Sequence, residues 1–178
     1  YEIIVPNTVK LVATYAFLEC NQLKTLTFQE FDPEDANYGQ QLLTIGNYST
    51  NSSAATTKSY GTIGGKVSAI TTINLPSHLA KIGFTAFANE SEVPVSIHFN
   101  QDASNVVIAD YAFNFANALA LHLPGVKSLG QYSFANCDYL EEVTFAALDS
   151  SLTALPNYLF YKDVALKAFE IPAQITKI

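Results

Sequence analysis

The sequence predicts a repeat solenoid, in which similar short coils stack on one another around one elongated core. Three observations lead to this fold class. An alternating run of apolar residues that closes at a proline recurs along the chain. An aromatic segment that ends in phenylalanine recurs in phase with it. No stretch has the length and spacing of a long amphipathic helix, so we expect the coils to consist of short elements.

The clearest copy of the repeated unit spans residues 121–145, LHLPGVKSLGQYSFANCDYLEEVTF. It starts with an alternating run that closes at Pro124 and continues through a Val-x-x-Leu-Gly step. An aromatic segment ending at Phe134 follows, and Cys137 and Leu140 then lead into the next alternating run. Other parts of the chain keep this order with drift, which makes the repeat the main signal in the sequence.

Two sets of positions measure the period. The position that closes each alternating run holds Pro6, Gln29, Pro76, Asn100, Pro124, Ala146 and Pro172, at intervals of 23, 47, 24, 24, 22 and 26 residues. The phenylalanine of the aromatic segment recurs as Phe17, Phe87, Phe113, Phe134 and Phe160. Because the two sets run in phase, we predict a single solenoid domain over residues 1–178 with about seven repeats.

The interval of 47 residues indicates one repeat enlarged by two insertions. The first, at about 30–41, is acidic, and the second, at about 51–68, is rich in Ser, Thr and Gly. Between them the repeat returns at residues 42–50, with Thr50 in the place of the phenylalanine. Such polar, glycine-containing segments are typical of surface loops.

Each alternating run predicts a short strand with one buried and one exposed face, because two apolar residues flank one that is usually polar or small. The runs at 26–28, 73–75, 97–99 and 143–145 show this pattern. Stacked about 4.8 Å apart, such strands form a parallel sheet. The proline lies where the chain leaves the strand and no ladder donor is required. We expect the remaining segments to turn the chain back, with one phenylalanine filling the core in each coil.

The unit resembles the leucine-rich repeat of the bacterial surface protein A (BspA-like) type, L-x-x-L-x-L-P-x-x-L-x-x-I-G-x-x-A-F-x-x-C. Residues 121–140, 73–87 and 3–23 match this pattern closely, while Thr50, Pro94 and Ala146 depart from it. The resemblance implies a right-handed leucine-rich repeat superhelix with a concave parallel β-sheet, one short strand per repeat of about 23 residues and little long helix.

The resemblance also implies a secreted or surface-anchored protein of a bacterium or protozoan, with a role in adhesion or protein binding rather than catalysis. We therefore expect an extracellular or cell-surface binding module. Its partner would be a protein, such as a host surface or matrix protein, or a glycan. A structural spacer that displays another domain is the alternative, and no cofactor is implied.

Composition and charge exclude several other classes of function. Charged residues make up 14% of the chain, against about 25% in a typical soluble domain. The net charge of −7 disfavours nucleic acid and anionic lipid, whose phosphates would repel the protein. The sequence has no apolar run of about 18 residues that could cross a membrane. It opens inside the repeat pattern without a start Met, so we expect a piece of a longer protein with interior repeats at both ends.

The outward-facing strand positions form the candidate binding surface. The residue between the two core positions of each run should point outward, as should the residue two places before it. Since successive strands stack, these positions form two columns on the concave face. The candidate partner-binding residues are Thr25, Thr27, Thr72, Asn74, Ser96, His98, His122, Glu142, Thr144 and Glu170.

Metal binding and catalysis find little support in the sequence. His98 and His122 occupy the same position in adjacent repeats and could share a zinc ion, but no third ligand lies within one strand of both. The acidic cluster at 32–35 could bind calcium, although it lacks the spacing of a known calcium loop and favours a solvated turn. No nucleophile-base set and no phosphate-binding glycine loop occurs, so we predict no metal site and no enzyme.

Three further features have structural interpretations. Cys20 and Cys137 share one position four coils apart, or roughly 20 Å, which favours buried thiols over a disulfide. A column of tyrosines precedes the phenylalanine in most repeats, and we expect their rings to pack along the stack with the hydroxyls at the surface. Its members are Tyr15, Tyr48, Tyr111, Tyr132 and Tyr158. Asn47, Asn51 and Asn89 fit the N-glycosylation pattern, which matters only in a eukaryotic source.

Overall fold

The computed structural model describes residues 1–32, 34, 42–46, 61–64, 68–89 and 91–178. These residues form short strands and no helix. The strands are β1 (Glu2–Val5), β2 (Leu11–Val12), β3 (Phe17–Leu18), β4 (Thr25–Phe28), β5 (Leu43–Ile45), β6 (Ile63–Gly64), β7 (Thr72–Leu75), β8 (Leu79–Ile82), β9 (Ser96–Phe99), β10 (Val106–Ile108), β11 (Ala120–Leu129) and β12 (Glu142–Leu148).

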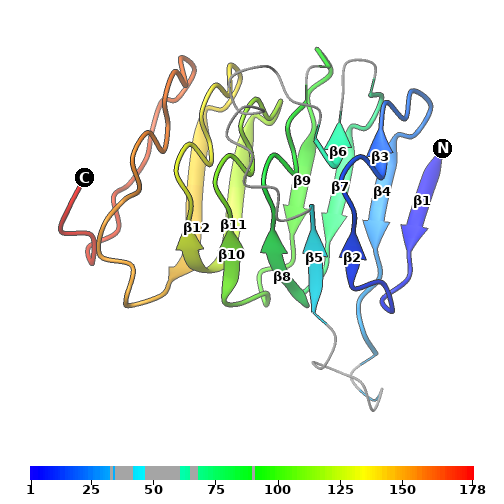
Figure 1. The fold of residues 1–178 in the computed structure, drawn as a ribbon, viewed down its shortest axis with the longest axis horizontal. Helices are drawn as coiled ribbons and strands as arrows, with labels where there is room; N and C mark the ends of the chain where they lie inside the picture. Colours follow the sequence, from blue (N-terminus) through cyan, green and yellow to red (C-terminus); the bar gives the residue numbers. More distant parts are fainter. Residues whose placement is uncertain (33, 35–41, 47–60, 65–67, 90) are drawn as a thin grey trace.

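The strands stack in chain order from one end of the molecule to the other, with the two termini at opposite ends (Figure 1). A four-stranded sheet has the order β1-β4-β7-β9, and a six-stranded sheet has the order β12-β11-β10-β8-β5-β2. A third sheet pairs β3 with β6. Every pair is parallel, as stacking of successive coils requires. The prediction of a repeat solenoid with parallel sheets is therefore confirmed.

The strand register reproduces the intervals in the sequence. Glu2 lies opposite Thr25, Thr25 opposite Thr72, and Thr72 opposite Ser96. Ala120 lies opposite Glu142 in the same way. The long interval between Thr25 and Thr72 thus returns the chain to the neighbouring strand in register, despite the additional residues between them.

The structure adds a second strand to most repeats. The Val-x-x-Leu step, which the sequence predicts as part of the return path, forms β2, β5, β8, β10 and the later part of β11. Val12 lies opposite Ile45, and Ile45 opposite Ile82. Such steps are two to four residues long. They are too short to display a period of two, so only the stacking of copies reveals that they are strands.

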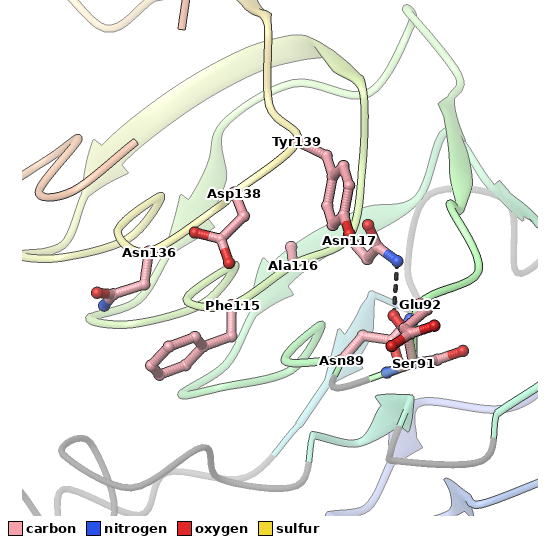
Figure 2. Close-up of a pocket in the computed structure, with 9 residues that line it drawn as sticks. All are labelled: Asn89, Ser91, Glu92, Phe115, Ala116, Asn117, Asn136, Asp138 and Tyr139. Carbon is pink, nitrogen blue, oxygen red and sulfur yellow. Dashed lines mark hydrogen bonds between the residues drawn. The ribbon is translucent and has the colours of Figure 1, made fainter. Parts of the chain in front are cut away.

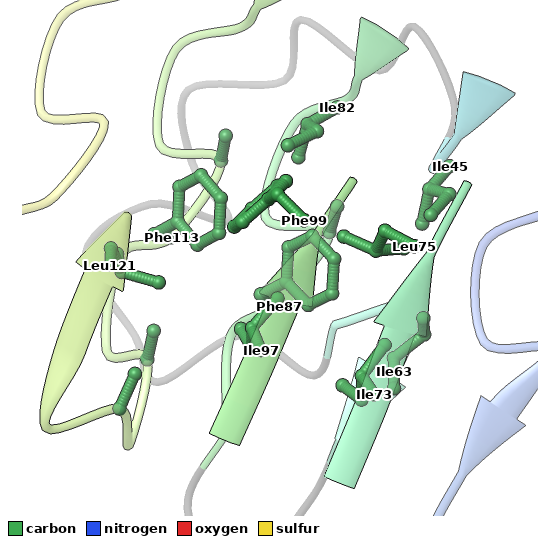
Figure 3. Close-up of a cluster of buried hydrophobic side chains, with 14 of the residues drawn as sticks. Ile45, Ile63, Ile73, Leu75, Ile82, Phe87, Ile97, Phe99, Phe113 and Leu121 are labelled. Carbon is green, nitrogen blue, oxygen red and sulfur yellow. The ribbon is translucent and has the colours of Figure 1, made fainter. Parts of the chain in front are cut away.

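A ladder of phenylalanine rings fills the core between the two main sheets. Phe87, Phe113 and Phe134 have at most 2% of their surface exposed. The ring centroids of Phe87 and Phe113 are 5.0 Å apart, those of Phe113 and Phe134 5.4 Å, and those of Phe134 and Phe160 5.6 Å. Figure 3 shows Phe87 and Phe113 surrounded by leucine and isoleucine side chains of the strands. From the third to the sixth repeat, one ring per coil therefore stacks in the core, as the sequence predicts.

A second ladder, of tyrosines, lies beside the first at the turns. The rings of Tyr111, Tyr132 and Tyr158 stack with centroid separations of 4.9 and 4.6 Å, which confirms the predicted packing for these three residues. All three have positive φ angles, of 60°, 55° and 59°. A left-handed conformation costs a non-glycine residue about 1–2 kcal/mol, and each aromatic pair contributes about 0.5–1.5 kcal/mol. Stacking on both faces of Tyr132 therefore offsets the strain of its backbone. Tyr48 lies outside the described residues.

Glycine in the Leu-Gly step permits neighbouring coils to approach closely. A Cβ atom at Gly130 would overlap the backbone of Ala109 and Asp110 in the preceding coil. At Gly83 it would lie 2.8 Å from the carbonyl carbon of Gly46, again in the preceding coil. Real Cβ atoms do not approach other atoms this closely, so a larger residue at Gly83 or Gly130 would push the coils apart.

The start of the first predicted insertion is anchored to the repeats. The Glu30 carboxylate accepts hydrogen bonds from the Ser77 backbone N–H at 2.8 Å and from the Asn100 amide at 2.8 Å. The ring of Phe31, 6% exposed, lies 4.4 Å from that of His78. Most of both predicted insertions lies outside the described residues. Their loop character stays a prediction.

Replacing Phe134 with alanine should lower the free energy of unfolding by about 3–5 kcal/mol, the range for truncation of a buried phenylalanine. The ring is fully buried and stacks on Phe113 and Phe160, so its loss leaves a cavity across three coils. Chemical denaturation of both proteins measures the difference. Val164→Ala is the control, because Val164 is 82% exposed and should change stability little. A loss under about 1 kcal/mol for Phe134→Ala would contradict this role of the ring.

Candidate functional site

The candidate binding surface is the outward face of β1, β4, β7 and β9, continued by the first residues of β11 and β12; we call it the strand face. Alternation along these strands positions its side chains. Leu26, Ile73 and Ile97 point into the core with at most 6% of their surface exposed. The residues that follow them, Thr27, Asn74 and His98, lie opposite one another on adjacent strands and face outward.

The candidate residues differ in exposure along the strand face. Thr25, Thr27, Thr72 and Asn74, on β4 and β7, are partly buried. The others, towards the C-terminal end, are exposed: Ser96, His98, His122, Glu142, Thr144 and Glu170. A partner therefore has the freest access to the half of the face that contains both histidines.

Hydrogen bonds between neighbouring strands hold part of this face in place. The Asn74 amide nitrogen donates to the Thr27 hydroxyl at 3.0 Å, and that hydroxyl donates to a Glu2 carboxylate oxygen at 3.3 Å. Further along, Nδ1 of His122 and the Thr144 hydroxyl are 2.9 Å apart. These contacts order the side chains before any partner arrives, which lowers the entropy cost of binding.

The two histidines are not aligned by a strand ladder. β9 and β11 belong to different hydrogen-bonded sheets, so no backbone register places His98 opposite His122. The side chain of Gln101 bridges the two strands instead. Its amide nitrogen donates to the carbonyl oxygens of Phe99 at 3.2 Å and His122 at 3.1 Å. The strand face is therefore continuous in space but changes its pairing between the fourth and fifth repeats.

The last candidate residue, Glu170, does not lie on a strand. Lys177 of the seventh repeat forms an isolated bridge with Ala154, and the predicted alternating run of this repeat at 169–171 has no strand conformation. Ala168, directly before that run, forms a second isolated bridge with Glu142. Glu170 is nevertheless exposed and lies two residues after this bridge. It therefore extends the strand face at its C-terminal edge.

Metal binding gains no support within the described part of the chain. No group of three or more His, Cys, Asp or Glu side chains lies there in an arrangement that could hold a metal ion. In the acidic cluster at 32–35, the Asp32 carboxylate accepts a hydrogen bond of 3.0 Å from the Glu34 backbone N–H. That contact is typical of a turn stabilised by its own side chain. Asp35 lies outside the described residues.

The two cysteines are free. Cys137 is fully buried, and its thiol lies 3.1 Å from the Phe113 carbonyl oxygen. Burial raises the pKa of this thiol well above its ordinary value, because the charged thiolate would lose its hydration. A thiol that stays protonated is a poor nucleophile, which fits a packing role for Cys137 in the core.

Asp163 has the most perturbed carboxyl group among the described residues. One of its oxygens accepts a hydrogen bond of 2.8 Å from the Cys137 backbone N–H, and the other is buried without a partner. Desolvation by burial raises the pKa of Asp163 to about 7, and the nearby Asp138 carboxylate adds to the rise. The sequence contains no repeat signal that could have pointed to it. Because its carboxyl group binds the backbone of the preceding coil at Cys137, we interpret Asp163 as a structural tie between the fifth and sixth repeats.

The glycosylation pattern at Asn89 coincides with a buried side chain. Asn89 is 8% exposed, and its amide oxygen accepts a hydrogen bond of 3.0 Å from the Ser91 backbone N–H. The Ser91 hydroxyl donates to the Ser68 carbonyl oxygen at 2.9 Å. In the folded state neither side chain is available to a modifying enzyme. Asn47 and Asn51 lie outside the described residues.

A small hollow that no sequence pattern predicts lies at the turns of the third, fourth and fifth repeats. It has a volume of about 200 Å³ and is shown in Figure 2. Its lining residues are Asn89, Ser91, Glu92, Phe115, Ala116, Asn117, Asn136, Asp138 and Tyr139. Asn89, Phe115 and Asn136 each follow a ladder phenylalanine by two residues. That common position was the available signal, but its residue types differ too much to stand out as a column.

Comparison with known families identifies the repeat. The BspA type leucine-rich repeat region matches residues 1–37 and 65–178 in six copies. The chain belongs to this family. No curated protein and no solved structure matches it. The BspA-type family generally comprises surface modules for protein binding or adhesion and is typically non-enzymatic. The described residues contain no helix long and apolar enough to span a bilayer.

The raised pKa of Asp163 predicts a dependence of stability on pH. In the folded protein the carboxyl group stays protonated up to about pH 7, whereas in the unfolded chain it titrates near its ordinary pKa of 3.8. Between these values the folded state binds more protons, so the free energy of unfolding should fall as the pH rises from 4 to 7.5. Asp163→Asn cannot ionise and should lack this component, and denaturant unfolding of both proteins across that range measures it. Parallel pH profiles for the two proteins would contradict the assignment.

Proposed function

We propose that this leucine-rich repeat domain is a non-catalytic module of a secreted or cell-surface protein that binds another protein through its strand face. The observation that carries the proposal is the row of exposed, partly preordered polar side chains from Ser96 to Thr144. Family membership supports the class of function. The strand face supports the location, because its side chains point outward from stacked parallel strands.

The chemistry of the strand face favours a protein partner. Its outward positions hold hydroxyl, amide, imidazole and carboxylate groups, which can both donate and accept hydrogen bonds. Small neighbours such as Ser96 and Ala120 allow a second surface to approach closely. The imidazole rings of His98 and His122 provide flat amphipathic contacts near the centre of the exposed half. This combination of a flat central contact and a polar rim is typical of protein interfaces.

Replacing Asn74, His98 and His122 together with alanine should weaken binding by about ten-fold or more, because these residues occupy the central column of the strand face. The measurement is surface plasmon resonance against purified extracellular matrix and host cell-surface proteins. The control replaces Lys127, Ser150 and Lys177 with alanine, since these residues are exposed and lie outside the strand face. It should bind like the unmodified protein.

Two outcomes would oppose the proposal. Equal affinity of the triple variant and the control would place the contact elsewhere. Absence of binding by the unmodified protein to every partner tested would favour the alternative, a structural spacer that displays another domain. Unfolding curves for both variants must match that of the unmodified protein, so that loss of binding is not confused with loss of fold.

A further inference from the structure

The hollow at the turns of repeats three to five has an unbalanced set of polar groups. Its rim holds two exposed carboxylates, Glu92 and Asp138, from different repeats. Neither carboxylate forms a hydrogen bond or ion pair with any other described residue. No lysine, arginine or histidine is among the described lining residues. The hollow is therefore rich in negative charge and in unused acceptors.

Most donors of the lining are already engaged within the protein. The Asn117 amide nitrogen donates to the Ser91 carbonyl oxygen at 2.6 Å, a contact drawn in Figure 2. The Asn136 amide nitrogen donates to Asn114 Oδ1 at 2.8 Å, and the Ser91 hydroxyl donates to Ser68. A ligand that fits must therefore bring donors rather than acceptors.

A buried acceptor in the lining points to the same kind of ligand. Asn117 is 3% exposed, and its Oδ1 has no hydrogen-bond partner. Leaving a buried acceptor unsatisfied costs about 1–3 kcal/mol. Figure 2 shows the Asn117 amide between Tyr139 and the Ser91 carbonyl that its nitrogen binds. A donor entering the hollow after a small side-chain adjustment would remove this cost.

The walls and the volume of the hollow restrict the class of ligand further. Phe115 and Tyr139 supply aromatic surface, which attracts cations as well as apolar groups. A hollow of about 200 Å³ accommodates an alkyl chain that ends in an ammonium group.

We propose that this hollow is a binding subsite for a lysine side chain of a partner protein. The ammonium group donates to the amide oxygen of Asn117 and is attracted by the carboxylates of Glu92 and Asp138 at the rim, while the alkyl stem packs on the aromatic surface of the lining. Acceptors from three separate repeats suit the three diverging donors of an ammonium group better than the planar fork of a guanidinium group. The net charge of −7 draws a basic segment towards the protein.

The lysine subsite rests on the proposed function in one respect, because the protein that binds the strand face is taken as the source of the lysine. The subsite lies at the turns and shares no residue with the strand face. It would give a partner held on the strand face a second, charge-dependent contact. Binding of an isolated lysine derivative can therefore be measured whether or not the strand face binds a protein.

The test is an NMR titration of the ¹⁵N-labelled protein with Nα-acetyl-lysine N-methylamide. We expect saturable shift changes in the amides of the hollow, centred on Asn89, Asn117 and Tyr139, that weaken as salt is added. The double variant Glu92→Gln and Asp138→Asn should bind about ten-fold more weakly, because it removes both charges but keeps the side-chain shapes. Its matched control, Glu19→Gln and Asp102→Asn, removes two exposed charges outside the hollow and should bind normally.

Parallel titrations separate lysine from other occupants. The norleucine analogue, which lacks the ammonium group, should not bind. Equal binding of that analogue, preferred binding of the arginine analogue, or binding of methyl glucoside in place of lysine would overturn the proposal. So would unchanged affinity in the Glu92/Asp138 double variant. The triple variant of Asn74, His98 and His122 should still bind the lysine derivative, because these residues lie outside the hollow. A failure of the proposed function can therefore be told apart from a failure of the lysine subsite.

Discussion

The structure depends on the stacking of each coil on the equivalent atoms of the next coil. Parallel strands in two sheets and one phenylalanine ring per coil repeat along the same axis, with ring separations of 5.0–5.6 Å from Phe87 to Phe160. No coil has a core of its own, since each short strand is stable only when it pairs with a strand of a neighbouring coil. Glycine at positions such as Gly130 and the stacked tyrosines of the turns satisfy the same requirement, because both permit neighbouring coils to approach closely.

The sequence predicted those parts of the fold that the period controls. The strand runs of the first six repeats, their register across the enlarged second repeat and the phenylalanine ladder from Phe87 to Phe160 follow from spacing, and the structure confirms them. The predicted seventh run, at 169–171, forms no strand. The sequence did not predict features that depend on contacts between non-equivalent positions of the repeat. Gln101 bridges two strands that do not pair, and Glu30 reaches across to Asn100. The second strand, present in the first five repeats, was missed because its apolar residues are too few to show a period.

The strand face and the hollow differ in how well the sequence predicts them, because only the strand face follows the period of the repeat. The strand face repeats with the coils, so its residues could be predicted from sequence spacing, although its role stays a proposal. The hollow forms where three turns of different length meet, and its carboxylates, amides and aromatic rings have no common period. A solenoid thus varies its turns while its strands stay uniform, and specificity can evolve at the turns without disturbing the stacked core.

The most direct test of the coil-on-coil register is a disulfide engineered across its least regular step. Thr25 and Thr72 are separated by 47 residues in the chain but lie directly opposite each other on adjacent parallel strands. With strands about 4.8 Å apart, cysteines at these positions fall within the range that a disulfide spans. We expect Thr25→Cys with Thr72→Cys to form the bond efficiently under mild oxidation, as mapped by mass spectrometry, and Thr25→Cys with Ser96→Cys, two strands apart, not to. Failure of the first pair, or equal cross-linking of the second, would contradict the register on which the account rests.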